Sequence, residues 1–122
     1  MGQDLFNHGY YWEAHEAWEG IWQIANRGSP LRALLKGLIL LCATGVKIRE
    51  GKRTPATRHA RGAGARLRDL TTVPHDHFLR ALGIPHGLLA DIAEATAEAM
   101  PASLVTTEGQ PEPVFDFVLG DA

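Results

Sequence analysis

The sequence predicts an all-α fold, a compact bundle of about five helices with an extended C-terminal tail. Apolar residues recur at helical spacing along nearly every segment, and no apolar alternation is long enough to sustain a strand. Gly, Ser-Pro and Thr-Pro stand where helices of ordinary length would end and begin. The 122 residues, 45% of them hydrophobic, suit one domain with a real core. We therefore expect a single helical domain over residues 1–101 and a proline-containing tail over residues 102–122.

Glycine and Ser-Pro signals bound the first three predicted helices. A short helix over Asp4–His8 ends at Gly9, and a second runs from Tyr10 to about Ala25. Ser29 is expected to cap the third, which runs from Pro30 to about Glu50. The centre of the third helix, GLILLCATGV, is apolar all round, which is typical of a helix packed on several sides.

The fourth predicted helix follows the same Thr-Pro logic, with Thr54 as its cap, and runs from Pro55 to about Leu70. Small residues dominate its inward stripe and let its backbone approach a neighbour closely. That stripe comprises Ala56, Ala60, Ala63, Leu67 and Leu70.

After a loop at Thr71–Pro74, a short helix is expected over Asp76–Leu82, with the Asp76 side chain as its cap. The last helix runs from Pro85 or His86 to about Met100, before Pro101. Its expected inward residues are Leu88, Ile92, Ala95 and Ala99, and its expected outward residues are Asp91, Glu94 and Glu98.

The tail combines prolines with large apolar residues. Pro111 and Pro113 argue against a helix, but VFDFVL at residues 114–119 holds more large apolar groups than a disordered tail normally carries. We expect this segment to dock, either on its own domain or on a second copy of the chain. The second alternative would make the protein a homo-oligomer through its tail.

Cysteine content and hydropathy indicate the class of protein. One cysteine, Cys42, excludes an internal disulfide and favours a reducing compartment. No signal-peptide pattern opens the chain, and the longest uncharged stretch, Gly37 to Val46, covers about half a membrane span. We expect a cytoplasmic protein without a membrane-spanning segment.

The formal net charge of −2 hides a strong asymmetry along the chain. The segment from Arg27 to Arg68 holds eleven Lys/Arg and one acid, a balance of +10, whereas the remaining segments hold one base and thirteen acids, a balance of −12. Such a split indicates either an anionic partner or attraction between two parts of one fold, and the second is the simpler interpretation.

The second predicted helix contains YYWEAHEAWEGIW, and all three Trp and both Tyr of the chain lie in it. At about 100° per residue, its aromatic stripe merges into a polar edge. The expected aromatic wall comprises Tyr11, Trp12, Trp18 and Trp22. The expected polar edge comprises Glu13, His15, Glu16 and Glu19. We expect these polar groups to be half buried between the second and third helices.

His15 and Glu19 stand four residues apart, so their side chains share one side of a helix. The pair could bind one metal ion or form a hydrogen bond, but the motif lacks the second histidine of HExxH. The favoured interpretation is a polar cluster whose groups are hydrogen-bonded within the fold, and no metal or cofactor is expected. If a metal binds, His15 and Glu19 are the candidate ligands. His15 with Glu16 or Glu19 also suits acid–base chemistry, yet no nucleophile accompanies them, because Cys42 sits in the most apolar helix.

Two long segments resemble a known family. LFNHGYYWEAHEAWEGIW, then LLKGLILLCATGVKIREGK and an Ala- and Arg-rich helix, resemble the small helical proteins grouped as domain of unknown function 309, over about Leu5 to Leu70. The residues that carry the first motif are Phe6, Asn7, Gly9, Trp12, Glu13, Ala14, His15, Glu16, Glu19 and Trp22. The resemblance implies an all-helical, bundle-like fold in which the first motif forms a polar cluster facing the next long helix. It implies no activity.

Three positions depart from that family's usual pattern. Lys36 and Lys47 stand where the family often has a glutamine and a histidine, and Leu40 stands where it often has a second glutamine. Helix geometry places these three residues and Ala43 in one row. If that row faces the second helix, a lysine replaces an imidazole, and its positive charge disfavours a metal ion. We expect Lys36 or Lys47 to form ion pairs with the acidic residues of the polar edge.

The basic stretch that begins just before the fourth helix and continues through it is the one nucleic-acid signal. Its residues are Lys52, Arg53, Arg58, Arg61, Arg66 and Arg68. No aromatic residues interleave with them, so base stacking is not indicated, and a solvated face partly paired with the acidic last helix is the simpler interpretation. Among the remaining histidines, His8, His59 and His86 lie near helix ends or on exposed faces, and no spacing links them.

Three functions stay open at this point. The favoured one is a non-enzymatic interaction or scaffold module with a partly buried His/Glu cluster between the second and third helices. The first alternative is a small-ligand or metal site at His15, Glu16 and Glu19, with hydrolysis as one activity it could support. The second alternative is a nucleic-acid-associated accessory protein that uses the Arg-rich fourth helix.

Overall fold

The structure, a computed structural model, describes residues 2–70, 73–102, 104, 113–115 and 117–120. Within these residues the chain forms six helices and no strand, which confirms the all-α prediction. The helices are α1 (Gly2–Asn7), α2 (Tyr11–Ile24), α3 (Pro30–Arg49), α4 (Arg53–Arg68), α5 (Leu79–Leu82) and α6 (His86–Glu98). None of the helices in this described part is long and apolar enough to cross a membrane.

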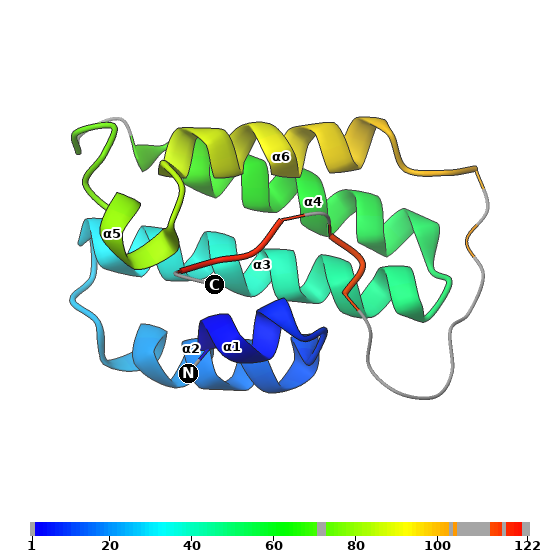
Figure 1. The fold of residues 1–122 in the computed structure, drawn as a ribbon, viewed down its shortest axis with the longest axis horizontal. Coiled ribbons are helices and arrows are strands. Elements are labelled where there is room, and N and C mark those ends of the chain that lie inside the picture. Colours follow the sequence, from blue (N-terminus) through cyan, green and yellow to red (C-terminus); the bar gives the residue numbers. More distant parts are fainter. Residues whose placement is uncertain (1, 71–72, 103, 105–112, 116, 121–122) are drawn as a thin grey trace.

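The four long helices pack in the order in which they follow along the chain. Helix α2 packs against α3, α3 against α4, and α4 against α6, while the short α1 packs against α2. Figure 1 shows these helices stacked from α2 to α6, with α1 in front of α2, α5 near the left end of α3, and the described end of the chain (red) crossing in front of α3.

Local sequence explains where α3 begins but not where α4 and α5 begin. Ser29 caps α3 as predicted, because its side-chain oxygen accepts the Arg32 backbone N–H at 3.2 Å. The predicted Thr54 cap is wrong: α4 begins at Arg53 and has no side-chain cap. The predicted Asp76 cap is also wrong, since α5 begins at Leu79 and the Asp76 backbone oxygen, not its side chain, accepts the Leu79 N–H.

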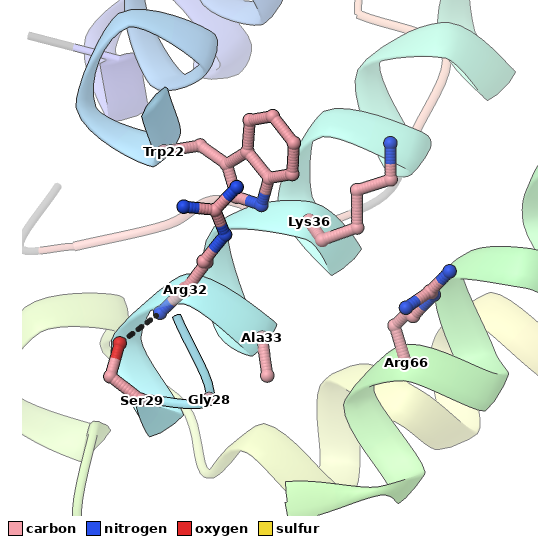
Figure 2. Close-up of a pocket in the computed structure, with 7 residues that line it drawn as sticks. All are labelled: Trp22, Gly28, Ser29, Arg32, Ala33, Lys36 and Arg66. Atoms are coloured by element: carbon pink, nitrogen blue, oxygen red, sulfur yellow. Dashed lines mark hydrogen bonds between the residues drawn. The ribbon is translucent and has the colours of Figure 1, made fainter. Parts of the chain in front are cut away.

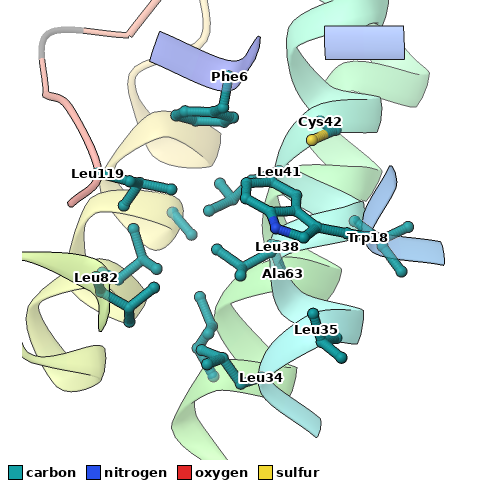
Figure 3. Close-up of a cluster of buried hydrophobic side chains, with 14 of the residues drawn as sticks. Phe6, Trp18, Leu34, Leu35, Leu38, Leu41, Cys42, Ala63, Leu82 and Leu119 are labelled. Atoms are coloured by element: carbon teal, nitrogen blue, oxygen red, sulfur yellow. The ribbon is translucent and has the colours of Figure 1, made fainter. Parts of the chain in front are cut away.

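The hydrophobic core surrounds α3 and takes buried residues from each of the six helices and from the tail, and Figure 3 shows leucines of α3 beside Phe6, Trp18, Leu82 and Leu119. Phe6 is 1% exposed and stands at the centre of an aromatic cluster. Its ring centroid is 5.3 Å from that of Tyr11, 6.0 Å from Trp18, 5.5 Å from Phe115 and 5.6 Å from Phe117. The cluster thus joins α1, α2 and the tail around one ring.

Small residues bring α3 close to α2 and α4. A Cβ atom on Gly45 would lie 2.6 Å from Cδ2 of Tyr11, and one on Gly37 would lie 2.7 Å from Cδ2 of Leu67. The predicted inward stripe of α4 is confirmed, since all five of its residues are buried. Close helix packing in this bundle therefore depends on positions that have no side chain or only a methyl group.

The predicted inward face of α6 is wrong by about one residue. Leu88 is 45% exposed, and the buried residues of the helix are His86, Leu89, Ala90, Ala93 and Ala97. The reason is the close approach of α4, where a Cβ on Gly64 would lie 3.7 Å from the Ala90 oxygen. Only the alanine-rich stripe of α6 fits there, and the predicted outward acids are exposed as expected.

The described part of the tail lies against its own chain. The Asn7 side chain donates to the Leu119 oxygen at 2.7 Å and accepts the Leu119 N–H at 2.8 Å. The Val114 N–H donates to the Tyr11 hydroxyl at 2.7 Å, and the Gly120 N–H donates to the Leu82 oxygen at 2.7 Å. Pro111, Asp116 and the predicted loop residues Thr71 and Thr72 lie outside the described residues.

One buried hydroxyl of α4, that of Thr57, allows a test of how much an unpaired polar atom lowers the stability of the fold. Thr57 is 8% exposed, and its Oγ1 has no hydrogen-bond partner. Thr57→Val keeps the shape and removes the unpaired polar atom, so we expect the free energy of unfolding to rise by about 1 kcal/mol in urea denaturation. Thr44→Val is the matched control, because the Thr44 hydroxyl donates to the Leu40 oxygen at 2.9 Å and its loss should not stabilise the protein. Equal effects of the two variants would contradict this account.

Candidate functional site

The structure divides the predicted aromatic wall on α2 into two parts. Tyr11 and Trp18 are 1% and 3% exposed and belong to the core, because positions 11, 14 and 18 face α3 and α1. Trp12 is 58% exposed and Trp22 is half buried, so these two rings lie on the outer side of the bundle. Polar groups that neighbour Trp12 and Trp22 are therefore accessible to a ligand or a partner.

His15 and Glu19 are brought together as predicted from their spacing. The Nδ1 atom of His15 lies 3.5 Å from Oε2 of Glu19, and the His15 ring stacks on Trp12 with centroids 5.4 Å apart. His15 Nδ1 is buried and has no hydrogen-bond partner, since its distance and geometry to Glu19 do not make a hydrogen bond. The expected fully satisfied cluster is thus only partly formed.

A small cavity lies beside His15. It has a volume of about 90 Å³ and is lined by Trp12, His15, Ala43, Val46 and Lys47. Two members of the predicted row on α3, Ala43 and Lys47, therefore border α2 at its outer edge. The cavity has room for a few water molecules or a group of similar size.

The predicted ion pairs between α3 and α2 are not formed. The Lys47 ammonium lies 2.8 Å from Glu50 Oε1, three residues further along its own helix, and Lys36 Nζ lies 5.3 Å from the Trp22 ring centroid. Within the part of the chain that the structure describes, neither lysine lies within 4 Å of Glu13, Glu16 or Glu19. Glu13 and Glu16 are exposed, because both point away from the side of α2 that packs on α3.

His59 joins this region from α4, although no pattern in the sequence links it to His15. Burial, helped by the charges of Arg58, Lys47 and His15, lowers the pKa of His59 below its ordinary value of 6.5. His15, Lys47 and His59 are therefore close enough to interact across three helices. His86 lies at a helix end, as expected, since it is the first residue of α6, and it is 6% exposed.

The pKa shift of His59 predicts a loss of stability in acid. Because the folded state binds the His59 proton less tightly than the unfolded state, its neutral form stabilises the fold fully above the unfolded pKa. This contribution is lost as the pH falls from 6.5 through the lower folded pKa. In His59→Gln, we expect the free energy of unfolding to fall less as the pH is lowered below 6.5. Urea denaturation at several pH values measures this change. The control is His75→Gln, at an exposed histidine, which should lose stability in acid as the parent does. If His59→Gln also loses stability in acid as the parent does, the assignment to His59 is contradicted.

A larger cavity opens at the junction of α2, α3 and α4. It has a volume of about 510 Å³ and is lined by Trp22, Gly28, Ser29, Arg32, Ala33, Lys36 and Arg66. Figure 2 shows Arg32 and Lys36 on either side of Trp22, with Arg66 reaching toward the same space from α4. The Arg32 Cζ atom lies 4.0 Å from the Trp22 ring centroid, and its Nη1 donates to the Ala25 oxygen at 3.0 Å. We call this cavity the Trp22 pocket.

The Trp22 pocket is strongly positive. None of its lining residues is acidic, and among the described residues Arg32, Lys36 and Arg66 make no ion pair. Other cations of the same segment are paired: Arg68 contacts Asp91 at 2.6 Å and also Glu94, and Lys52 lies 3.6 Å from Glu50. The Arg68 pairs confirm that part of the charge asymmetry is attraction between α4 and the acidic α6.

Metal ligands are not gathered at either cavity. Over the described ranges, no group of three or more His, Cys, Asp or Glu side chains is arranged to hold a metal ion. Cys42 is 0% exposed, and burial raises the pKa of its thiol far above the ordinary value. The arrangement therefore suits binding of an anion at the Trp22 pocket better than covalent chemistry by a thiol.

Comparison with known proteins gives one result. A family model described as "Domain of unknown function (DUF309)" matches residues 1–59, which cover α1, α2, α3 and the first residues of α4. No curated protein and no solved structure matches the chain significantly. The matched segment contains every residue that lines the small cavity and every residue that lines the Trp22 pocket except Arg66.

Proposed function

We propose that this chain, which belongs through its residues 1–59 to the DUF309 family, described as a domain of unknown function, is a non-enzymatic interaction module. In this proposal it binds an anionic group in the Trp22 pocket. The binding surface is the part of α2, α3 and α4 that lines the Trp22 pocket. The protein holds the anion and catalyses no reaction on it.

One observation carries the proposal: three cations line one pocket that contains no carboxylate. Surface cations normally gain little from pairing and are often unpaired, but three positive side chains around one concave site repel one another. Binding of an anion relieves that repulsion. Elsewhere in the same basic segment, Arg68 is neutralised within the fold by Asp91 and Glu94.

The proposal is tested by salt-dependent anion binding. We expect citrate and a decaglutamate peptide to bind, as measured by calorimetry and tryptophan fluorescence, and a decalysine peptide not to bind. Raising the salt concentration from about 50 to about 500 mM should weaken binding at least tenfold, because the ions screen a solvent-connected site.

Matched charge variants locate the binding site. The combined variant Arg32→Gln, Lys36→Gln and Arg66→Gln should abolish anion binding, whereas Lys52→Gln, Arg58→Gln and Arg61→Gln together remove the same charge from outside the pocket and should leave it largely intact. Failure of all anions to bind, or equal loss in both triple variants, would overturn the proposal.

Three expectations from the sequence stay predictions. A metal or hydrolytic site at His15, Glu16 and Glu19 is one, and metal analysis of protein purified without an affinity tag would test it. Homo-oligomerisation through the tail is another; Phe115 already stacks on Phe6 of its own chain, and light scattering would measure the oligomeric state. The cytoplasmic location is the third.

A further inference from the structure

We infer that the anionic group held in the Trp22 pocket is a phosphoryl group of a small phosphate monoester, with Trp22 forming an apolar wall for the part of the molecule that carries it. This inference rests on the proposed function and names the ligand class of the same pocket. Four features of the pocket support it: its charge, the geometry of Arg32, its position at the start of α3, and its size.

The charge of the pocket suits a dianion. Arg32, Lys36 and Arg66 together supply three positive charges, and no acid lines the pocket to compensate them. A phosphate monoester carries about −1.5 to −2 at neutral pH, whereas a single carboxylate carries −1. Two of the three cations are guanidinium groups, whose planar donors match the oxygens of a phosphoryl group in pairs.

Arg32 is oriented before any ligand arrives. Its Nη1 donates to the Ala25 oxygen at 3.0 Å, and its guanidinium lies over the Trp22 ring with Cζ 4.0 Å from the centroid. These two contacts use one N–H and one face of the guanidinium, so further N–H donors remain for the oxygens of a ligand. A pre-oriented arginine loses little side-chain entropy when it binds.

The pocket lies at the amino end of α3. Gly28 and Ser29 line it, and they immediately precede the first residue of this 20-residue helix. The positive end of the helix dipole adds to the field of the three side chains and favours a negative group at this place. The helix end alone would not make a site, but here it reinforces a pocket that is already cationic.

The volume of the pocket leaves room for a ligand larger than a free phosphate ion. At about 510 Å³, it falls within the range of about 300–1,000 Å³ that small-molecule sites occupy. Trp22 is half buried at its wall, and the part of its ring that Arg32 does not cover offers apolar surface on which a planar or apolar group can pack. A small organic phosphate monoester uses both the cations and this wall.

The test compares ligands that differ in one group. Phenyl phosphate and benzoate share the ring and differ in the anion, inorganic phosphate lacks the ring, and a decathymidylate oligonucleotide carries phosphodiesters. By calorimetry, we expect phenyl phosphate to bind at least about tenfold more tightly than benzoate and than the oligonucleotide per site. Its affinity should rise between about pH 5 and pH 7, where its second proton dissociates, and that of benzoate should not.

Two variants separate the parts of the site. Arg32→Lys keeps the charge but removes the paired donors, and should weaken phenyl phosphate at least about tenfold while weakening benzoate much less. Trp22→Leu should weaken phenyl phosphate more than inorganic phosphate, because it removes the wall for the phenyl ring as well as one of the two contacts that orient Arg32. Arg61→Lys, outside the Trp22 pocket, is the control and should bind all ligands as the parent does.

Each contrary result has a distinct meaning. Equal binding of phenyl phosphate and benzoate would overturn the phosphoryl assignment and leave the proposed anion-binding function standing. Tighter binding of the oligonucleotide than of phenyl phosphate would also overturn it, in favour of a nucleic-acid backbone. Binding of none of the four anions, together with citrate and decaglutamate, would overturn both the inference and the proposed function.

Discussion

Phe6→Ala is expected to lower the free energy of unfolding by about 3–5 kcal/mol, a large part of the total stability of a domain of this size. Phe6 is 1% exposed, and its ring contacts Tyr11, Trp18 and the two phenylalanines of the tail. Truncation leaves a cavity where α1, α2 and the tail meet. Urea denaturation followed by circular dichroism measures the loss.

Cys42 supplies a second measurement of the same variant. The thiol is 0% exposed and its pKa is raised by burial, so it should react with a thiol reagent only when the structure opens. Phe6→Ala should speed this reaction strongly. Tyr10→Ala is the control, because Tyr10 is 40% exposed and its loss should change stability by less than about 1 kcal/mol. Similar stabilities of the two variants would refute the central place given to Phe6.

Gly45→Ala is expected to cost about 1–3 kcal/mol relative to Gly20→Ala, although both replace a glycine inside a helix. The added Cβ at position 45 would lie 2.6 Å from Cδ2 of Tyr11, whose ring is buried and whose hydroxyl accepts the Val114 N–H. The ring cannot move aside without breaking that hydrogen bond and its contact with Phe6. Helix α2 must therefore shift away from α3.

Comparison with Gly20→Ala corrects for the general preference of helices for alanine over glycine. Gly20 is exposed on α2 and has no atom within 4 Å of an added Cβ, so Gly20→Ala should stabilise the protein by about 0.5–1 kcal/mol. Thermal or urea denaturation of both variants gives the comparison. Stabilisation by Gly45→Ala would show that α2 and α3 are packed less closely than the structure has them.

The helices could be predicted from the sequence because their signals are local. Ser29 and Pro30 mark the start of α3 within the chain itself, and the apolar centre of α3 already indicates a helix packed on several sides. The inward face of α6 could not be predicted in the same way. Helix α6 buries the stripe through Ala90 rather than the one through Leu88 because Gly64, which lies on another helix, approaches it closely.

The candidate site was predictable only in part, for a related reason. The spacing of His15 and Glu19 on one helix predicts their approach, and the structure places them 3.5 Å apart. The Trp22 pocket instead joins α2, the start of α3 and the carboxyl-terminal turn of α4, and no spacing relates Arg66 to Trp22. The sequence showed an excess of basic residues but not which of them the fold would leave without an acid.

The pairing of Asn7 with Leu119 joins residues 112 positions apart. A nascent chain emerges from the ribosome with its amino end first, so Asn7 emerges 112 residues ahead of the segment with which it pairs. Until residue 119 has left the exit tunnel, the Phe6 surface stays open to water and to other nascent chains. Native packing around Phe6 therefore waits for Phe115 and Phe117, and chaperones that shield apolar surface in that interval are expected to raise the yield of native protein.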